Sequence, residues 1–193
     1  MYGGLAPVPY TFLTGLLIDD EGQLFVMDWD RTTERWRPLD DPDDAKRFEV
    51  TGLESFRGAS EVVIAVAVSY QVLDRNLEAA FPALPIVRLT LEGGNVNAHW
   101  SAEKQAALAK QFLNAAIAVE GRGVRRINLV LAEPNSLVFR FGRAYDRRNL
   151  PALSVWQFER DTIPPYPWAI EMPVGARRRA DIVRGPLEVG RPT

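Results

Sequence analysis

Cysteine is absent from the 193 residues of this sequence. Its absence excludes disulfide bonds, thiolate catalysis and zinc sites built from cysteine. A chain without cysteine is typical of a reducing compartment, and we therefore expect a cytoplasmic location.

Histidine is almost as scarce, because His99 is the single one. A lone histidine argues against a histidine-dependent triad and a zinc site, and we expect it to serve packing or lie on the surface. The carboxylates are numerous but form no catalytic motif, and neither a GxGxxG nor a Walker A sequence is present. We therefore expect no catalytic residue, no metal and no cofactor.

A large net charge and a long apolar run are also missing. The formal net charge of -2 gives no bulk attraction for long nucleic acid. The longest apolar stretch, VVIAVAV at 62–68, is too short to cross a bilayer. No basic segment precedes an apolar run near the first residue, as a signal peptide would require. We expect neither long nucleic acid as a partner nor a membrane span in this chain.

Strand and helix patterns alternate from residue 61 onward. Continuous β-branched runs indicate strands buried on both faces, and segments with helical spacing separate them. The expected strands are 61–70, 85–94, 125–132 and 152–160, and the expected helices are 72–81, 101–123 and 136–148. Ser101 is the expected N-cap of the long helix. This order predicts an α/β fold with a Rossmann-like parallel sheet flanked by helices.

The first part of the chain repeats the last helix and strand of this unit. At a constant offset of 127 positions, six residues are identical, without a gap. The pairs are Pro7 and Pro134, Phe12 and Phe139, Gly15 and Gly142, Asp19 and Asp146, Trp29 and Trp156, and Pro38 and Pro165. We interpret residues 1–48 as a partial copy of the unit, 49–175 as the complete copy, and 176–193 as an extended or disordered tail.

Ligands of open parallel sheets bind at the carboxyl ends of the strands, where the strand order reverses. The residues expected there are polar, aromatic or flexible, and they include no nucleophile–base pair. They are Ser69, Tyr70 and Gln71 after the first strand, Glu92, Gly93, Gly94 and Asn95 after the second, and Glu133, Pro134, Asn135 and Ser136 after the third.

The turn at 133–136 is the most informative of these segments. Asn135 or Ser136 is expected to cap the next helix and to leave its first N–H groups facing the crevice, where a phosphate binds. A role as helix caps alone stays open. Arg140 could reach the same ligand or lie in solvent. Trp156 could stack on a nucleobase or pack in the core.

These residues resemble a known family. The strand ending in LAEPNSLVF, the helix with FGRAYDR, the strand LSVWQFERD and the aromatic YPWAIEM are similar to the end of a SAVED domain. VVIAVAVSYQV is similar to an earlier strand of that family. The resemblance covers residues 5–38 and 61–173 and implies two fused CARF-like units.

The resemblance implies a sensor of a cyclic oligonucleotide, of two, three or four nucleotides, in bacterial anti-phage systems of the CBASS or type III CRISPR kind. Ligand binding would drive self-association and switch on an effector such as a nuclease, protease, TIR or membrane module. The sequence departs from the family because it contains no recognisable effector and only part of the first unit. We therefore expect a fragment, or a chain completed by another.

Two other functions stay open. A small α/β enzyme acting on nucleotides or nucleosides could use Glu92 or Glu133 as an acid, base or nucleophile, including for cleavage of its own cyclic ligand. An oligomerisation scaffold without a small ligand could instead cover the apolar surface of segment 5–38 with a neighbouring copy.

Overall fold

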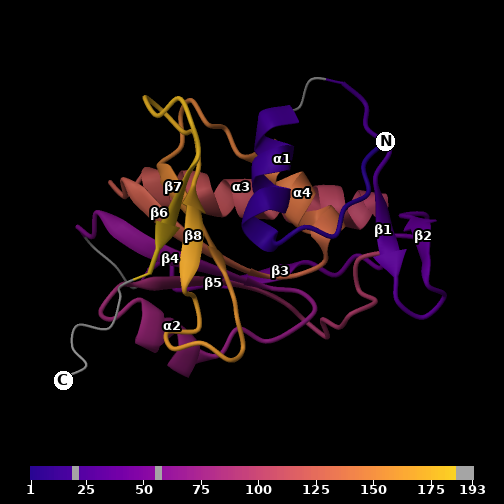
Figure 1. The fold of residues 1–193 in the computed structure, drawn as a ribbon, viewed down its shortest axis with the longest axis horizontal. Helices are drawn as coiled ribbons and strands as arrows, with labels where there is room; N and C mark the ends of the chain where they lie inside the picture. Colours follow the sequence, from indigo (N-terminus) through magenta and orange to yellow (C-terminus); the bar gives the residue numbers. More distant parts are fainter. Residues whose placement is uncertain (19–21, 55–57, 186–193) are drawn as a thin grey trace.

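A computed structural model describes residues 1–18, 22–54 and 58–185 of the chain. Its main sheet has seven strands in the order β3-β5-β4-β6-β7-β8-β9 (Figure 1). The strands are β3 (Phe48–Thr51), β4 (Glu61–Ala67), β5 (Ile86–Leu91), β6 (Arg126–Ala132), β7 (Ala152–Gln157), β8 (Trp168–Glu171) and β9 (Asp181–Arg184). The central strands β5, β4, β6 and β7 are parallel, whereas β3, β8 and β9 pair antiparallel at the two edges. The predicted Rossmann-like α/β fold is confirmed, and the antiparallel edges make the sheet mixed.

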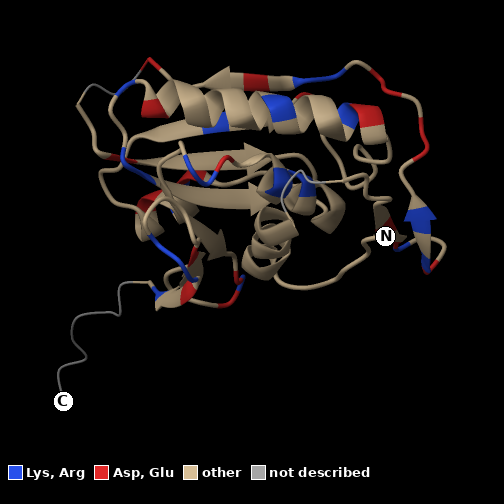
Figure 2. Cartoon of the chain, turned by 90° about the horizontal axis from the view of Figure 1, so that it is seen from above, with Lys and Arg blue, Asp and Glu red and all other residues tan. Residues whose placement is uncertain are grey.

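Helices cover both faces of the sheet, as the alternating side chains of β4 require. Val62, Ile64 and Val66 pack in one core with α1 (Val8–Ile18), α3 (Ala102–Glu120) and α4 (Asn135–Ala144). Val63 and Ala65 point to the other face and pack with α2 (Asp74–Ala80). Because both faces of β4 are covered, its sequence reads as an unbroken apolar run. Charged residues lie mainly on outer helices and connecting turns (Figure 2).

The helices begin and end close to the expected positions. The Ser101 hydroxyl accepts a hydrogen bond from the Lys104 N–H, which confirms it as the N-cap of α3. The third helix is shorter than predicted, because α4 ends at Ala144 rather than at residue 148. No helix among the described residues is long and apolar enough to cross a membrane.

α1 and α4 cross where a glycine of each helix touches the backbone of the other. A Cβ on Gly15 would lie 2.1 Å from the carbonyl oxygen of Phe139, and one on Gly142 would lie 2.2 Å from that of Phe12. At the 127-residue offset, each contact is the counterpart of the other. The two helices are therefore related by a pseudo-two-fold axis, as expected if the sequence repeat reflects two copies of one unit.

The first turns of the two helices repeat the same hydrogen bonds. The Pro7 carbonyl accepts from the N–H groups of Tyr10 and Thr11, and the Pro134 carbonyl accepts from those of Leu137 and Val138. The paired residues Asp19 and Asp146 cannot be compared, because Asp19 lies outside the described residues. The division of the chain into units at 1–48 and 49–175 stays a prediction.

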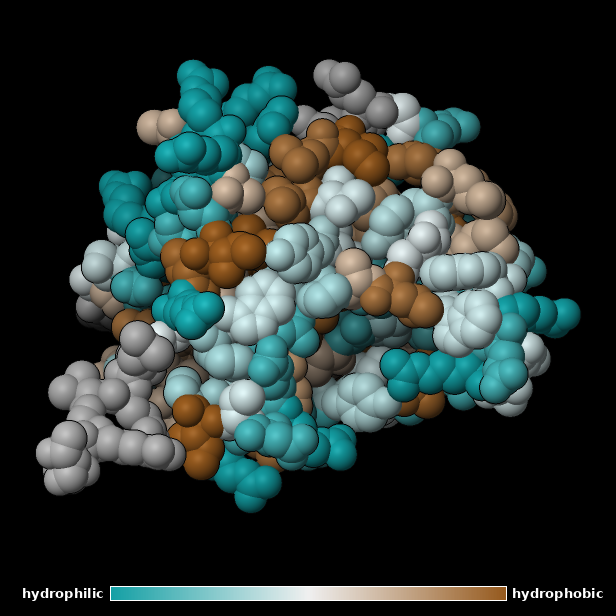
Figure 3. Space-filling model, in the orientation of Figure 1, coloured by the Kyte–Doolittle hydropathy of each residue, from teal (hydrophilic) through white to brown (hydrophobic). Residues whose placement is uncertain are grey.

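The strand that follows α1 does not join the main sheet. β1 (Met27–Asp30) pairs antiparallel with β2 (Arg35–Pro38) in a separate two-stranded sheet, which Figure 1 shows beyond the end of α4. α1 accordingly has no sheet on its outer side, and Leu17 and Ile18 are 56% and 40% exposed. Figure 3 shows apolar surface over α1.

The expected tail contains an ordered strand. β9, at Asp181–Arg184, pairs with β8, and Arg177 forms ion pairs with Glu171 and Asp181. A strand of four residues with charges at both ends carries no apolar pattern from which it could be predicted. The rest of the tail, 186–193, lies outside the described residues.

Candidate functional site

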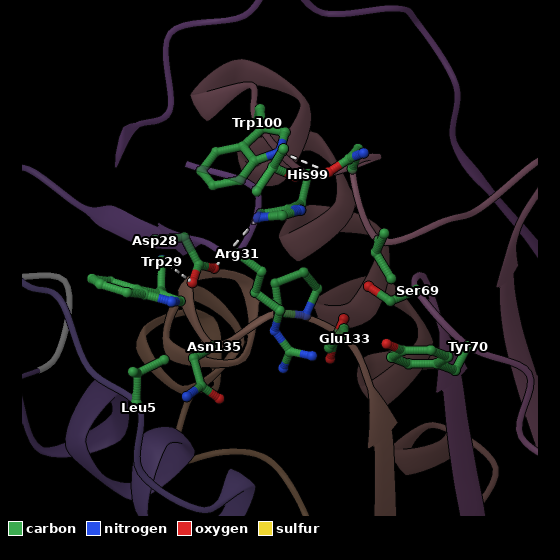
Figure 4. Close-up of a pocket in the computed structure, with 14 residues that line it drawn as sticks. Leu5, Asp28, Trp29, Arg31, Ser69, Tyr70, His99, Trp100, Glu133 and Asn135 are labelled. Carbon is green, nitrogen blue, oxygen red and sulfur yellow. Dashed lines mark hydrogen bonds and ion pairs between the residues drawn. The ribbon is translucent and has the colours of Figure 1, made fainter. Parts of the chain in front are cut away.

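A cavity of about 200 Å³ lies at the carboxyl ends of β4 and β6 (Figure 4). From β4 the chain passes through α2 to β5 on one side, and it returns through α3 to β6 on the other side. The gap between β4 and β6 is therefore the topological switch point, where open α/β sheets bind ligands. The lining residues are Leu5, Asp28, Trp29, Arg31, Thr32, Ser69, Tyr70, Val96, Asn97, His99, Trp100, Glu133, Pro134 and Asn135.

Five of the predicted site residues meet at this cavity. They come from the ends of the two strands that flank the switch point and are Ser69, Tyr70, Glu133, Pro134 and Asn135. The Tyr70 ring is 60% exposed, which leaves it free to stack on a ligand. The Asn135 amide donates hydrogen bonds to the carbonyl oxygens of Gly4 and Ala6, so it also ties the first residues of the chain to the cavity wall.

The turn after β5 does not reach the cavity. Glu92, Gly93, Gly94 and Asn95 are exposed and do not line it. A Cβ on Gly94 would lie 2.3 Å from the carbonyl oxygen of Val68, so glycine is needed there for close backbone packing. Gln71, which follows Tyr70, is also exposed and outside the lining.

Arg140 and Trp156 also lie away from the cavity lining. The Trp156 indole N–H donates to Asn128 Oδ1 at 2.9 Å, and its ring packs edge-on against Phe81 on the α2 face of the sheet. Arg140 is half-buried on α4, and its Nε has no hydrogen-bond partner among the described residues. Burial and the nearby charge of Arg143 lower the pKa of Arg140.

The predicted cap of α4 is wrong. Pro134 is the N-cap residue, and no side chain of the turn caps the helix. The Ser136 N–H instead donates to Asp28 Oδ2 at 3.1 Å, and the Ser136 hydroxyl accepts from the buried Gln105 amide at 2.8 Å. Ser136 is buried and outside the lining. Because a carboxylate of this chain already occupies the helix N-terminus, that end is not an open phosphate site.

Polar atoms without partners are concentrated around the cavity. Buried polar groups nearly always have hydrogen-bond partners. Within the described part of the chain, the buried atoms without a hydrogen bond include Ser69 Oγ and both carboxyl oxygens of Glu133, and the ring nitrogens of His99 have only the ion-pair contact with Asp28. All three side chains line the cavity. Buried polar groups that lack partners and belong to residues lining one cavity are candidates for contacts with a ligand.

A comparison with known protein families identifies the family of this chain. The family model that matches residues 1–172 is SAVED, described as the SMODS-associated and fused to various effectors sensor domain. The chain belongs to the SAVED family. The resemblance read from the sequence is confirmed, and the chain is a sensor domain. No curated protein matches this sequence.

Solved structures of SAVED/CARF receptors share the fold. The Acinetobacter baumannii Cap4 receptor with the cyclic trinucleotide 2'3'3'-cAAA has a TM-score of 0.61 at 11% identity, over 81% of this chain and 35% of that chain. The Moraxella osloensis Cap4 receptor has a TM-score of 0.54 at 13% identity, over 83% of this chain and 34% of that chain. This SAVED chain thus spans about a third of the length of each receptor.

The first segment of this SAVED domain supplies cavity residues that the sequence did not reveal. Asp28, Trp29 and Arg31 come from β1 and the turn after it, and His99 and Trp100 precede α3. At the 127-residue offset Trp29 matches Trp156, but Trp156 does not line the cavity. The repeat therefore did not predict the position of Trp29 at the site. His99 was expected on the surface or in packing; it is buried and lines the cavity. Its neighbour at the site is Asp28, 71 positions earlier, so no local pattern joins them.

A buried Asp28–His99 pair sets the electrostatics on one side of the cavity. His99 Nε2 lies 3.5 Å from Asp28 Oδ2, and both side chains are almost fully buried. Burial lowers the pKa of His99, and the negative charge of Asp28 opposes that effect. The neutral imidazole is therefore the form that burial favours in the folded protein at neutral pH.

We expect His99 to titrate below its ordinary pKa of 6.5 and Asp28→Asn to lower that pKa further. The variant keeps an oxygen for the Ser136 N–H but removes the opposing charge. Because the pKa is lowered on folding, the stability from neutral His99 is present above pH 6.5 and is lost as the pH falls. NMR titration of the single histidine measures both values. A pKa that rises in Asp28→Asn would contradict the pairing.

Proposed function

We propose that this SAVED domain binds a cyclic oligonucleotide second messenger of bacterial anti-phage defence in the cavity between β4 and β6. The observation that carries the proposal is that Ser69 and Glu133, whose buried side-chain oxygens have no hydrogen-bond partner among the described residues, line one cavity at the switch point. Membership of a sensor family and a shared fold with a receptor solved with a cyclic trinucleotide support the same ligand class.

The dimensions of the cavity favour one nucleotide rather than a whole cyclic ligand. Its volume of about 200 Å³ is below the roughly 300–1,000 Å³ of sites that enclose a small molecule. Aromatic rings of Tyr70, Trp29 and Trp100 line it and offer stacking surfaces for a base. Arg31 is the arginine among the lining residues and is the candidate partner for a phosphate. The remaining nucleotides of the ring would lie outside the cavity.

We expect Tyr70→Ala to weaken binding of a cyclic oligonucleotide by about 1–3 kcal/mol, because stacking on an exposed ring contributes that amount per base. Isothermal calorimetry against cyclic di-, tri- and tetranucleotides measures the affinities. The matched control is Phe158→Ala, which removes another exposed aromatic ring outside the cavity. Absence of binding across the panel would contradict the proposed function, and equal losses in both variants would contradict stacking on Tyr70.

Cleavage of the bound ligand is a second candidate function, and one observation favours it. Of the two acids considered, Glu133 lines the cavity and Glu92 does not. A general acid or base must reach the reacting atoms, so Glu133 is the residue to test. Loss of ligand turnover in Glu133→Gln with unchanged affinity would support catalysis. Absence of turnover in the unmodified protein would support sensing alone.

The proposed function also includes two kinds of protein partner, other copies of this domain and an effector. In this view, ligand binding drives self-association of the domain and activates an effector such as a nuclease, protease, TIR or membrane module. The family description, which names fusion to various effectors, supports the effector.

A further inference from the structure

The Glu133 carboxyl is the most unusual group in the cavity wall. Glu133 follows β6 directly, and both of its carboxyl oxygens are buried with no hydrogen-bond partner in the described ranges 1–18, 22–54 and 58–185. Its side chain lines the cavity, and in the view of Figure 4 it is drawn between Arg31 and Tyr70. An ionised carboxylate in this position would lack any compensating hydrogen bond, which is costly in a buried site.

Other titratable groups line the same cavity as Glu133. The titratable groups that line the cavity with Glu133 are Asp28 from β1, Arg31 from the following turn, Tyr70 after β4 and His99 before α3. Asp28 is the acceptor for the Ser136 N–H, and the arginine is exposed. A second ionised carboxylate beside Asp28 would repel a ligand that carries phosphates. Burial raises the pKa of Glu133 well above its ordinary value of 4.5.

We propose that Glu133 reads the base of the bound nucleotide as an uncharged carboxylic acid, and that it pairs with adenine. This inference rests on the proposed function and adds to it a residue that determines specificity. The acid donates its O–H to a ring nitrogen of the base, and its carbonyl oxygen accepts from the neighbouring amino group.

The hydrogen-bonding groups of an uncharged carboxylic acid match those of adenine. Adenine offers a ring-nitrogen acceptor beside an amino donor, and side chains with one donor and one acceptor, such as asparagine and glutamine, pair with it through two hydrogen bonds. An uncharged carboxylic acid has the same donor and acceptor, whereas a carboxylate only accepts. The two hydrogen bonds would also satisfy both orphaned oxygens of Glu133.

Calorimetry with cyclic triadenylate at pH 7.5–9 tests the proposal, because this range lies well above the pKa of His99, which burial lowers from 6.5. We expect Glu133→Ala to weaken binding on the order of tenfold and Glu133→Gln to restore most of the affinity, since the amide supplies a permanent donor. The affinity of the unmodified protein should stay constant or fall as the pH rises, while that of Glu133→Gln stays constant. Glu78→Gln, an exposed glutamate of α2, is the matched control.

Two results would overturn the proposal. One is an affinity that rises with pH in the unmodified protein but not in Glu133→Gln, because the carboxylate would then be the binding form. The other is a Glu133→Gln variant that binds as weakly as Glu133→Ala.

A measurement without ligand separates this inference from the proposed function. If no cyclic oligonucleotide binds, infrared spectroscopy of the ligand-free protein at pH 7.5 still tests the charge of Glu133. A carboxylic acid band that disappears in Glu133→Gln supports the uncharged side chain, and the absence of such a band overturns it. Thermal unfolding gives a second readout. Because the pKa is raised on folding, ionisation destabilises the protein as the pH rises above 4.5, and Glu133→Gln should remove that loss.

Discussion

Replacing Gly142 with alanine is expected to force α1 away from α4 and to destabilise the protein by about 3 kcal/mol or more. The new Cβ would lie 2.2 Å from the carbonyl oxygen of Phe12 and 3.0 Å from the N–H nitrogen of Leu16. These are backbone atoms of a packed helix, so no side-chain rotation can relieve the overlap. Gly15→Ala should have a similar effect, because its Cβ would meet the Phe139 carbonyl oxygen from the other helix.

Urea unfolding followed by circular dichroism measures both losses. Gly121→Ala is the matched control, since Gly121 lies at the end of α3 with a negative φ and the nearest atom to its new Cβ is 3.5 Å away. That change should leave the free energy of unfolding nearly unaltered. A free energy of unfolding in Gly142→Ala equal to that of Gly121→Ala would show that the helices do not cross as described.

Phe112→Ala is expected to reduce the free energy of unfolding by about 3–5 kcal/mol. Phe112 of α3 is fully buried, stacks on Phe141 of α4 at 4.7 Å between ring centres, and meets Phe12 of α1 edge-on at 6.4 Å. One ring thus joins the three helices on this face of the sheet. Its removal leaves a cavity that the rigid crossing of α1 and α4 cannot close.

The control for this change lies on the same helix. Ile117 of α3 is 50% exposed, so Ile117→Ala removes an apolar side chain without opening a buried cavity. Denaturant midpoints of the two variants give the comparison. Losses of equal size would mean that Phe112 is not part of a tightly packed core.

The central fold was predictable because its signals are local. The buried runs of β4 and β6, the cap at Ser101 and the alternation of strand and helix depend on neighbouring residues. The edge strands were not predicted because four-residue strands with mixed exposure, such as β9 and β3, have no distinctive pattern. Their pairing with β8 and β5 depends on residues distant in the sequence.

The residues of the site also divide into those that the sequence predicted and those that it did not. Ser69, Tyr70 and Glu133 follow strands that the sequence revealed, and the switch-point rule then placed them together. Asp28 could not be assigned, because its partners Ser136 and His99 are 108 and 71 positions away. The prediction that Asn135 or Ser136 caps α4 was wrong for the same reason. The carboxylate that accepts from the Ser136 N–H in the first turn of α4 belongs to Asp28 of β1, which is distant in the sequence.

The sequence by itself determined the α/β order, because hydrophobic periods are properties of the chain alone, and its motifs carried the resemblance to the family. Only the tertiary structure decided which polar groups are left without partners. Burial and hydrogen bonding depend on what packs against each atom. The unsatisfied carboxyl of Glu133 therefore became visible only when β4, β6 and the first segment of the chain were assembled around one cavity.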